Sequence, residues 1–69
     1  MRYQEILSKS LYELKREAGL NAETLAKRLG VSRATVYVWL NGRTTGKKVD
    51  RLLAAMGKTS KELLEKMKE

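Results

Sequence analysis

Apolar residues recur at steps of three and four along most of this 69-residue chain, which is the spacing of amphipathic α-helices. The first run predicts a long helix that ends at Gly19, a residue type that commonly stops helices. Its apolar seam is expected to consist of Tyr3, Leu7, Leu11, Leu14 and Ala18. Charged residues fill the outer positions, so this helix is expected to form the lid of a small core.

Two shorter apolar runs follow in residues 21–42, and Gly30 separates them. Asn21 and Ser32 precede these runs, where a side-chain oxygen can accept a backbone N–H that a helix start leaves free. Gly30 stands where a helix commonly ends in the left-handed conformation. The stretch therefore predicts a helix, a tight turn and a second helix. The residues expected to hold this geometry are Leu25, Ala26, Leu29, Gly30, Val31, Val36 and Trp39.

A small residue is needed where two helices cross at a steep angle, and Ala26, four positions before the glycine, fits this role. Leu40 is expected to pack inward beside Val36 and Trp39. The opposite face of the second helix is left to solvent or to a partner, and it carries Arg33, Ala34, Tyr37 and Val38. The alternative is an ordinary helical hairpin in which the small residues serve packing alone.

The last third of the chain predicts two further helices. Val49, Leu52, Leu53 and Met56 form the inner face of one, which Gly57 closes. Residues 59–62 have the spacing of a capping box, and the apolar side of the helix that follows is expected to be Leu63, Leu64 and Met67. The pattern predicts an all-α, compact five-helix domain that spans residues 1–69.

Composition argues against catalysis. The chain has no histidine and no cysteine, which removes the commonest general base, the commonest metal ligand and any disulfide framework. The acidic residues are scattered, and residues 41–48 space their glycines too closely for a phosphate-binding P-loop. No enzyme activity, cofactor, metal or small-molecule ligand is expected. No segment resembles a signal peptide or a membrane span, so a soluble cytoplasmic protein is expected.

The net charge of +7 is unevenly placed. Residues 21–51 carry seven bases and two acids, and therefore most of the excess. A basic surface around an exposed helix is what the neutralisation of nucleic-acid phosphates requires. Many small proteins are basic for other reasons, so the charge supports this interpretation only together with the helix pattern.

The inner residues of the two short helices, with Asn41 and Gly42 after them, resemble the helix-turn-helix of the phage repressor and Cro family. The resemblance covers roughly residues 7–65 and implies a lambda-repressor-like fold, with the helix-turn-helix formed by helices 2 and 3. Two positions depart from the family pattern. Ala22 stands where a phosphate-binding glutamine is usual, and Lys15 and Leu40 stand where many relatives have a buried arginine–glutamate pair.

The resemblance implies that helix 3 enters the major groove of double-stranded DNA. Arg33 suits guanine and Ala34 a thymine methyl group, and Tyr37 and Val38 complete the base-reading set. The residues expected at phosphates are Asn21, Lys27, Arg28, Ser32, Arg43, Thr44, Lys47 and Lys48. Two alternatives stay open. Tyr37 and Val38 could pack against a partner, and residues 41–48 could be a solvated loop.

The resemblance favours a small transcriptional repressor that binds a palindromic operator as a homodimer. An antitoxin or protein-interaction adaptor that retains the fold is the main alternative. An engineered helical domain, suggested by the lack of Pro, Cys and His, is disfavoured by the departures from the family pattern. Met67, Leu64, Tyr3 and Ile6 could form a dimer interface, but they could equally be the edge of a small core.

Overall fold

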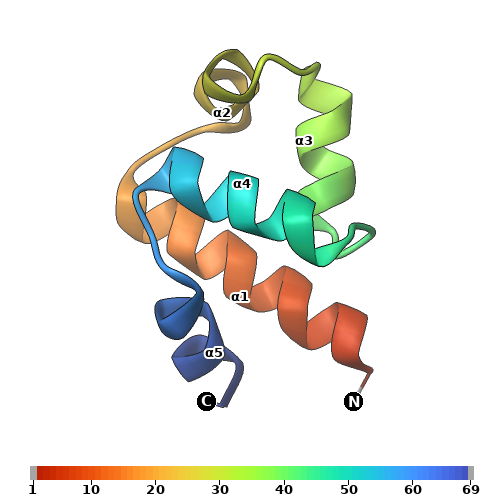
Figure 1. The fold of residues 1–69 in the computed structure, drawn as a ribbon, viewed down its shortest axis with the longest axis vertical. Helices are drawn as coiled ribbons and strands as arrows, with labels where there is room; N and C mark the ends of the chain where they lie inside the picture. Colours follow the sequence, from red (N-terminus) through yellow and green to blue (C-terminus); the bar gives the residue numbers. More distant parts are fainter. Residues whose placement is uncertain (1, 69) are drawn as a thin grey trace.

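A computed structural model describes residues 2–68, and these residues form five α-helices without strands (Figure 1). The helices are α1 (Tyr3–Ala18), α2 (Ala22–Leu29), α3 (Arg33–Leu40), α4 (Gly46–Met56) and α5 (Ser60–Lys68). This confirms the predicted all-α, five-helix class. None of the helices in residues 2–68 is both long and apolar enough to cross a membrane.

The helices enclose one core of buried apolar side chains. α1 and α4 run across the middle of the molecule, with α2 and α3 on one side and α5 on the other (Figure 1). The core is made by Leu7, Leu11, Leu14, Ala22, Leu25, Ala26, Val36, Trp39, Leu40, Val49, Leu52, Leu53, Met56 and Leu63. Leu40 is fully buried, as expected for an apolar replacement of a charged partner.

Two predicted core positions are wrong at the edges of the molecule. Tyr3 is 69% exposed because it lies in the first turn of α1, beyond the helices that cover the rest of the seam. Leu64 is 58% exposed, and α5 reaches the core through Leu63 and the partly buried Met67 instead. Ala22, which stands where the family usually has a phosphate-binding glutamine, is buried in the core.

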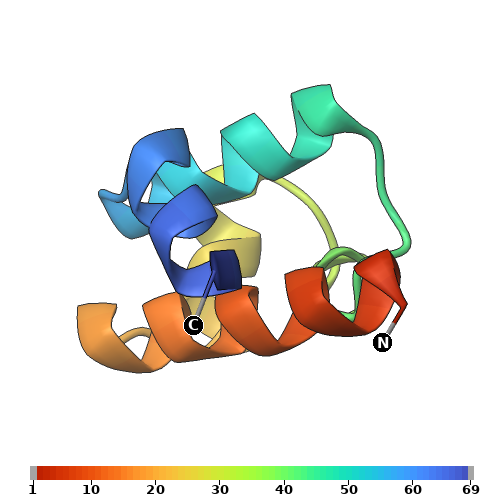
Figure 2. The same ribbon diagram turned by 90° about the horizontal axis from the view of Figure 1, so that it is seen from below.

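The first turn of α1 lies beside the segment between α3 and α4, as seen from below (Figure 2). The Gln4 side chain donates a hydrogen bond to the Asn41 carbonyl at 3.2 Å. Gly42 adopts a φ of +82°, and a Cβ at this position would lie 2.7 Å from the Gln4 carbonyl oxygen. The chain reversal after α3 therefore needs glycine both for its backbone angle and for the close approach to α1.

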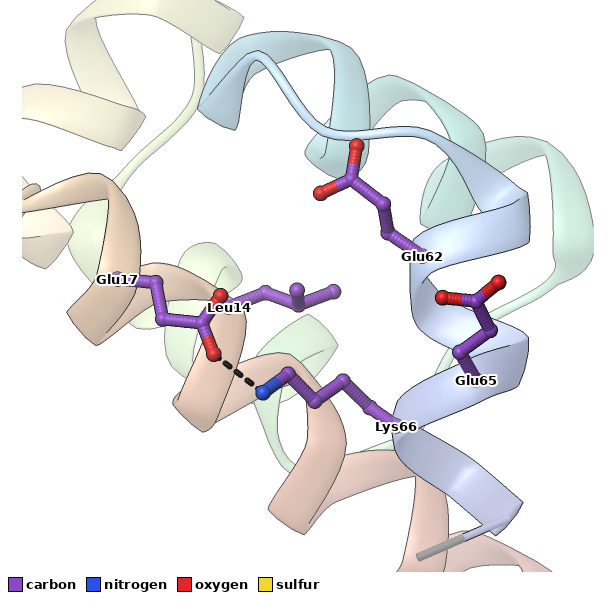
Figure 3. Close-up of a pocket in the computed structure, with 5 residues that line it drawn as sticks. All are labelled: Leu14, Glu17, Glu62, Glu65 and Lys66. Atoms are coloured by element: carbon purple, nitrogen blue, oxygen red, sulfur yellow. Dashed lines mark ion pairs between the residues drawn. The ribbon is translucent and has the colours of Figure 1, made fainter.

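Charged side chains join α5 to the end of α1 (Figure 3). Glu17 forms an ion pair with Lys66 and a second one, at 3.6 Å, with Lys58. Lys58 also lies 3.6 Å from Glu62, so the network spans α1, the α4–α5 turn and α5. The hydrogen bond from Lys66 lowers the pKa of the Glu17 carboxyl below its usual range, and the two lysine charges add to this effect.

Substitution of Gly42 by alanine is expected to destabilise the fold by about 3 kcal/mol, because left-handed strain and a steric clash with Gln4 add together. Gly57→Ala is the matched control, since Gly57 has a φ of +71° but no atom within 4 Å of the added Cβ. It is expected to cost only about 1 kcal/mol. Urea unfolding of both variants measures the difference, and equal losses would contradict the close approach at Gly42.

Glu17→Gln is expected to destabilise the protein at pH 7 but not in acid. A carboxyl whose pKa is lowered by folding stabilises the native state above its ordinary pKa of 4.5, and this contribution disappears as the pH falls through the lowered value. Thermal unfolding from pH 7 to pH 2 should therefore show the two curves converging in acid. Glu65→Gln is the matched control, because Glu65 lies on the neighbouring α5 but forms no ion pair within residues 2–68, and it should stay close to wild type at pH 7.

Candidate nucleic-acid interface

The turn between α2 and α3 is closed by backbone and cap hydrogen bonds. Gly30 has a φ of +70° and ends α2, and the Val31 N–H returns to the Ala26 carbonyl at 3.0 Å. This is the bond of a Schellman motif, which needs a left-handed residue in between. Ser32 then begins α3, and its hydroxyl accepts the Thr35 N–H at 3.1 Å. The predicted stop at Gly30 and start at Ser32 are both confirmed.

The inner face of the helix pair packs largely as the apolar spacing indicates. Leu25, Ala26, Val36 and Trp39 are buried, so the small side chain of Ala26 lies in the core as predicted. Leu29 and Val31 are half-buried at the rim and pack against the same core. The helix-turn-helix geometry expected from the sequence is therefore present.

The outer face of α3 is open to solvent. Four exposed residues lie on this face over two turns of the helix: Arg33, Ala34, Tyr37 and Val38. Tyr37 exposes 49% of its surface and Val38 exposes 44%. Neither side chain is part of the core. This face therefore offers apolar surface and a guanidinium group to a binding partner.

Some of the residues predicted to contact phosphates already form hydrogen bonds or ion pairs within the protein. Asn21 caps α2 by accepting the Thr24 N–H at 2.8 Å, and Lys27 lies 3.9 Å from Glu23. Arg28 donates to the Ala55 carbonyl at 2.9 Å, so its guanidinium has a partner within the fold.

Four cations on and after α3 have no such partner. Arg33, Arg43, Lys47 and Lys48 are exposed, and none of them forms an ion pair within residues 2–68. Thr44 is half-buried beside them. The unpaired positive charge of this part of the molecule therefore lies on α3, on the loop that follows it and on the first turn of α4.

Polar contacts from α1, which the sequence pattern did not reveal, fix the far end of α3. Besides the bond from Gln4, the Tyr12 hydroxyl donates to the Asn41 side-chain oxygen at 3.2 Å. Both contacts span about 30 or more positions of the chain, 37 for Gln4 and 29 for Tyr12. No local spacing signals such a pair, because Gln4 and Tyr12 read as ordinary surface residues of an amphipathic helix.

The side of the molecule away from α2 and α3 carries acidic and basic side chains together. A shallow cavity of about 220 Å³ lies between α1 and α5, lined by Leu14, Glu17, Glu62, Glu65 and Lys66 (Figure 3). Glu17 and Glu62 form ion pairs with Lys58 and Lys66, so these two lysines are already engaged by carboxylates. The candidate interface for nucleic acid is therefore the surface formed by α3 and the following loop.

The comparison with known proteins agrees with this geometry. A sequence model of a protein family described as helix-turn-helix matches residues 11–63, which include α2, α3 and α4 in full. No curated protein and no solved structure matches the chain.

Ser32→Ala is expected to destabilise the protein by about 1 kcal/mol, because the first turn of α3 loses its cap. Thr45 precedes α4 in the same way but makes no side-chain cap hydrogen bond, so Thr45→Ala is the matched control. It should change the free energy of unfolding by a few tenths of a kcal/mol at most. Urea titrations of the two variants provide the comparison, and a Thr45 effect as large as that of Ser32 would argue against the cap.

Proposed function

Because the chain belongs to the helix-turn-helix family of the Cro/C1 type, we propose that it is a small transcriptional repressor that binds a palindromic operator as a homodimer. DNA binding is the function that a helix-turn-helix of this family implies. The repressor role, the dimer and the operator symmetry are the proposed parts. The proposal treats residues 1–69 as one domain that acts in the cytoplasm, without enzyme activity or cofactor.

The exposed outer face of α3 is the observation that carries the proposal. Its helix starts at a capped Ser32, and backbone N–H groups at a helix N-terminus suit a phosphate oxygen. Arg43, Lys47 and Lys48, which form no ion pair within residues 2–68, follow along the same part of the chain. This combination supports phosphate contacts at both ends of a short helix, which would hold its middle against the base edges.

Arg33 is proposed as the principal base-reading residue. Its guanidinium fork matches the O6 and N7 acceptors that guanine presents in the major groove. Ala34 permits close approach and could contact a thymine methyl group, while Tyr37 offers a hydroxyl and Val38 apolar contact. Asn21, Lys27, Arg28, Ser32, Arg43, Thr44, Lys47 and Lys48 remain the proposed phosphate contacts.

The proposed homodimer follows from the small size of the reading surface. α3 has only eight residues, so one copy reads few base pairs. Two copies related by a two-fold axis would place their reading helices about 34 Å apart, one turn of the duplex. The large exposure of Tyr3 and Leu64 supplies apolar surface on which such a pair could associate.

An adaptor or antitoxin is the second candidate. The exposed Tyr37 and Val38 favour it, because their apolar surface would suit a protein partner as well as DNA. The charge distinguishes the two functions. A protein partner would not require the unpaired cations of residues 43–48, whereas DNA binding would show a strong dependence on salt.

The decisive experiment selects bound sites from random duplex DNA and then measures affinity against salt concentration. Inverted repeats with half-sites one helical turn apart are expected. If each subunit neutralises about five phosphates, the logarithmic salt slope of the dimer should be near −9. Salt-independent binding, or no binding at all, would leave the adaptor function as the better account.

Arg33→Ala and Lys47→Ala test the two proposed kinds of contact on the selected site. Loss of Arg33 should cost about 1–3 kcal/mol and relax the preference at one base position. Loss of Lys47 should weaken binding to all sequences alike and reduce the salt slope by about 1. Fluorescence anisotropy with specific and random duplexes measures both, and equal losses on the two DNAs for the Arg33 variant would rule out base reading by that residue.

A further inference from the structure

One exposed arginine of α4 contacts both helices of the helix-turn-helix. The guanidinium carbon of Arg51 lies 5.7 Å from the centre of the Trp39 ring, on α3. Its Nη2 donates a hydrogen bond to the Leu29 carbonyl, at the end of α2, at 3.2 Å. The Arg51 side chain thus links α4 to both α2 and α3.

Both contacts suit a guanidinium in particular. The face of an indole ring attracts a cation, and Trp39 is only 5% exposed, so its ring is held in place by the core. Leu29 is the last residue of α2, where carbonyl groups lack partners within the helix and positive charge is favoured. A flat, always charged fork can cover the ring and donate to the carbonyl at once, which a single ammonium group does less well.

We propose that Arg51 is a positioning residue, which holds α3 at the angle to α2 that base reading requires and does not bind phosphate. The inference rests on the proposed function, since it concerns how the reading helix is oriented. Binding sites need their contact groups held within about half an ångström, and supporting residues supply that constraint. Arg51 acts through Trp39 and the Leu29 carbonyl, so its positive charge interacts with groups of the protein rather than with DNA phosphates.

The structure provides a matched control on the neighbouring helix. Arg28 donates to the Ala55 carbonyl, near the end of α4, at 2.9 Å. It therefore joins α2 to α4 by the same kind of bond as Arg51, but within residues 2–68 it forms no side-chain hydrogen bond, ion pair or cation–π contact with α3. Substitution of Arg28 removes one guanidinium–carbonyl hydrogen bond but leaves the contacts of Arg51 with Trp39 and Leu29 in place.

The test compares Arg51→Met, Arg51→Lys and Arg28→Met on the selected site and on random duplex DNA. The ratio of the two affinities should fall about tenfold in Arg51→Met, the size expected when a cation–π contact and a charge-assisted hydrogen bond are lost together. Arg51→Lys should recover only part of that ratio. Arg28→Met should keep the wild-type ratio, whatever its effect on overall affinity. The salt slope of Arg51→Met should equal that of wild type, whereas a lost phosphate contact would reduce it by about 0.9.

Trp39 provides a signal that a general loss of stability would not move. It is the only tryptophan of the chain, so the fluorescence reports on the surroundings of this one ring, which include Arg51. In folded Arg51→Met the emission should shift to longer wavelength, and in folded Arg28→Met it should not. Urea unfolding first establishes that each variant is folded at the temperature of the measurement.

Two results would overturn the inference while leaving the proposed function intact. One is that Arg51→Met keeps the same ratio of affinities for the selected site and for random DNA as the wild-type protein. The other is a reduced salt slope together with full rescue by lysine, which would make Arg51 a phosphate contact. If the wild-type protein selects no DNA site at all, the proposed function and this inference fail together.

Discussion

The crossing of α2 and α3 is the constraint on which the rest of the structure depends. It needs a methyl-sized side chain at Ala26 and a left-handed backbone at Gly30, and the structure has both. Because α2 stops there, Ser32 can cap a new helix whose inner face, Val36 and Trp39, enters the same core. The outer face of α3 is then left without a partner in the fold. The surface proposed to read DNA is thus exposed because the short turn at Gly30 ends α2 and lets α3 start in a new direction.

A core of this size cannot fix five helices by apolar packing alone, since small domains bury a modest fraction of their surface. Side chains that donate to carbonyls at helix ends supply further constraints. Gln4 does so at the end of α3, Arg51 at the end of α2 and Arg28 near the end of α4. Each of these bonds joins two helices and satisfies an acceptor that a helix terminus leaves free. α3 is consequently held by α1 at one end and through Trp39 by α4.

The local features of the fold could be predicted from the sequence because caps and stops depend on a few neighbouring residues. Asn21, Ser32 and Gly30 all behave as their positions indicate. The errors concern how far a partner helix extends. Periodicity places Tyr3 and Leu64 on apolar faces, but it does not tell that no helix covers them, and it does not distinguish a buried Ala22 from an exposed one. The contacts of Gln4 and Arg51 are equally invisible, because they join segments far apart in the chain.

The structure also changes the meaning of the basic charge. The sequence places seven bases in residues 21–51, and a count alone would assign all of them to a nucleic-acid surface. Arg28 and Arg51 donate to backbone carbonyls of neighbouring helices, and Lys27 lies 3.9 Å from Glu23 on the surface of α2. The other four form no ion pair within residues 2–68, and they lie on α3, in the loop after it and at the start of α4, on the surface proposed to face a duplex. In the proposed function, Arg51 therefore orients the reading helix while the four other cations bind DNA, and only the second group adds counterion release to the salt dependence of the affinity.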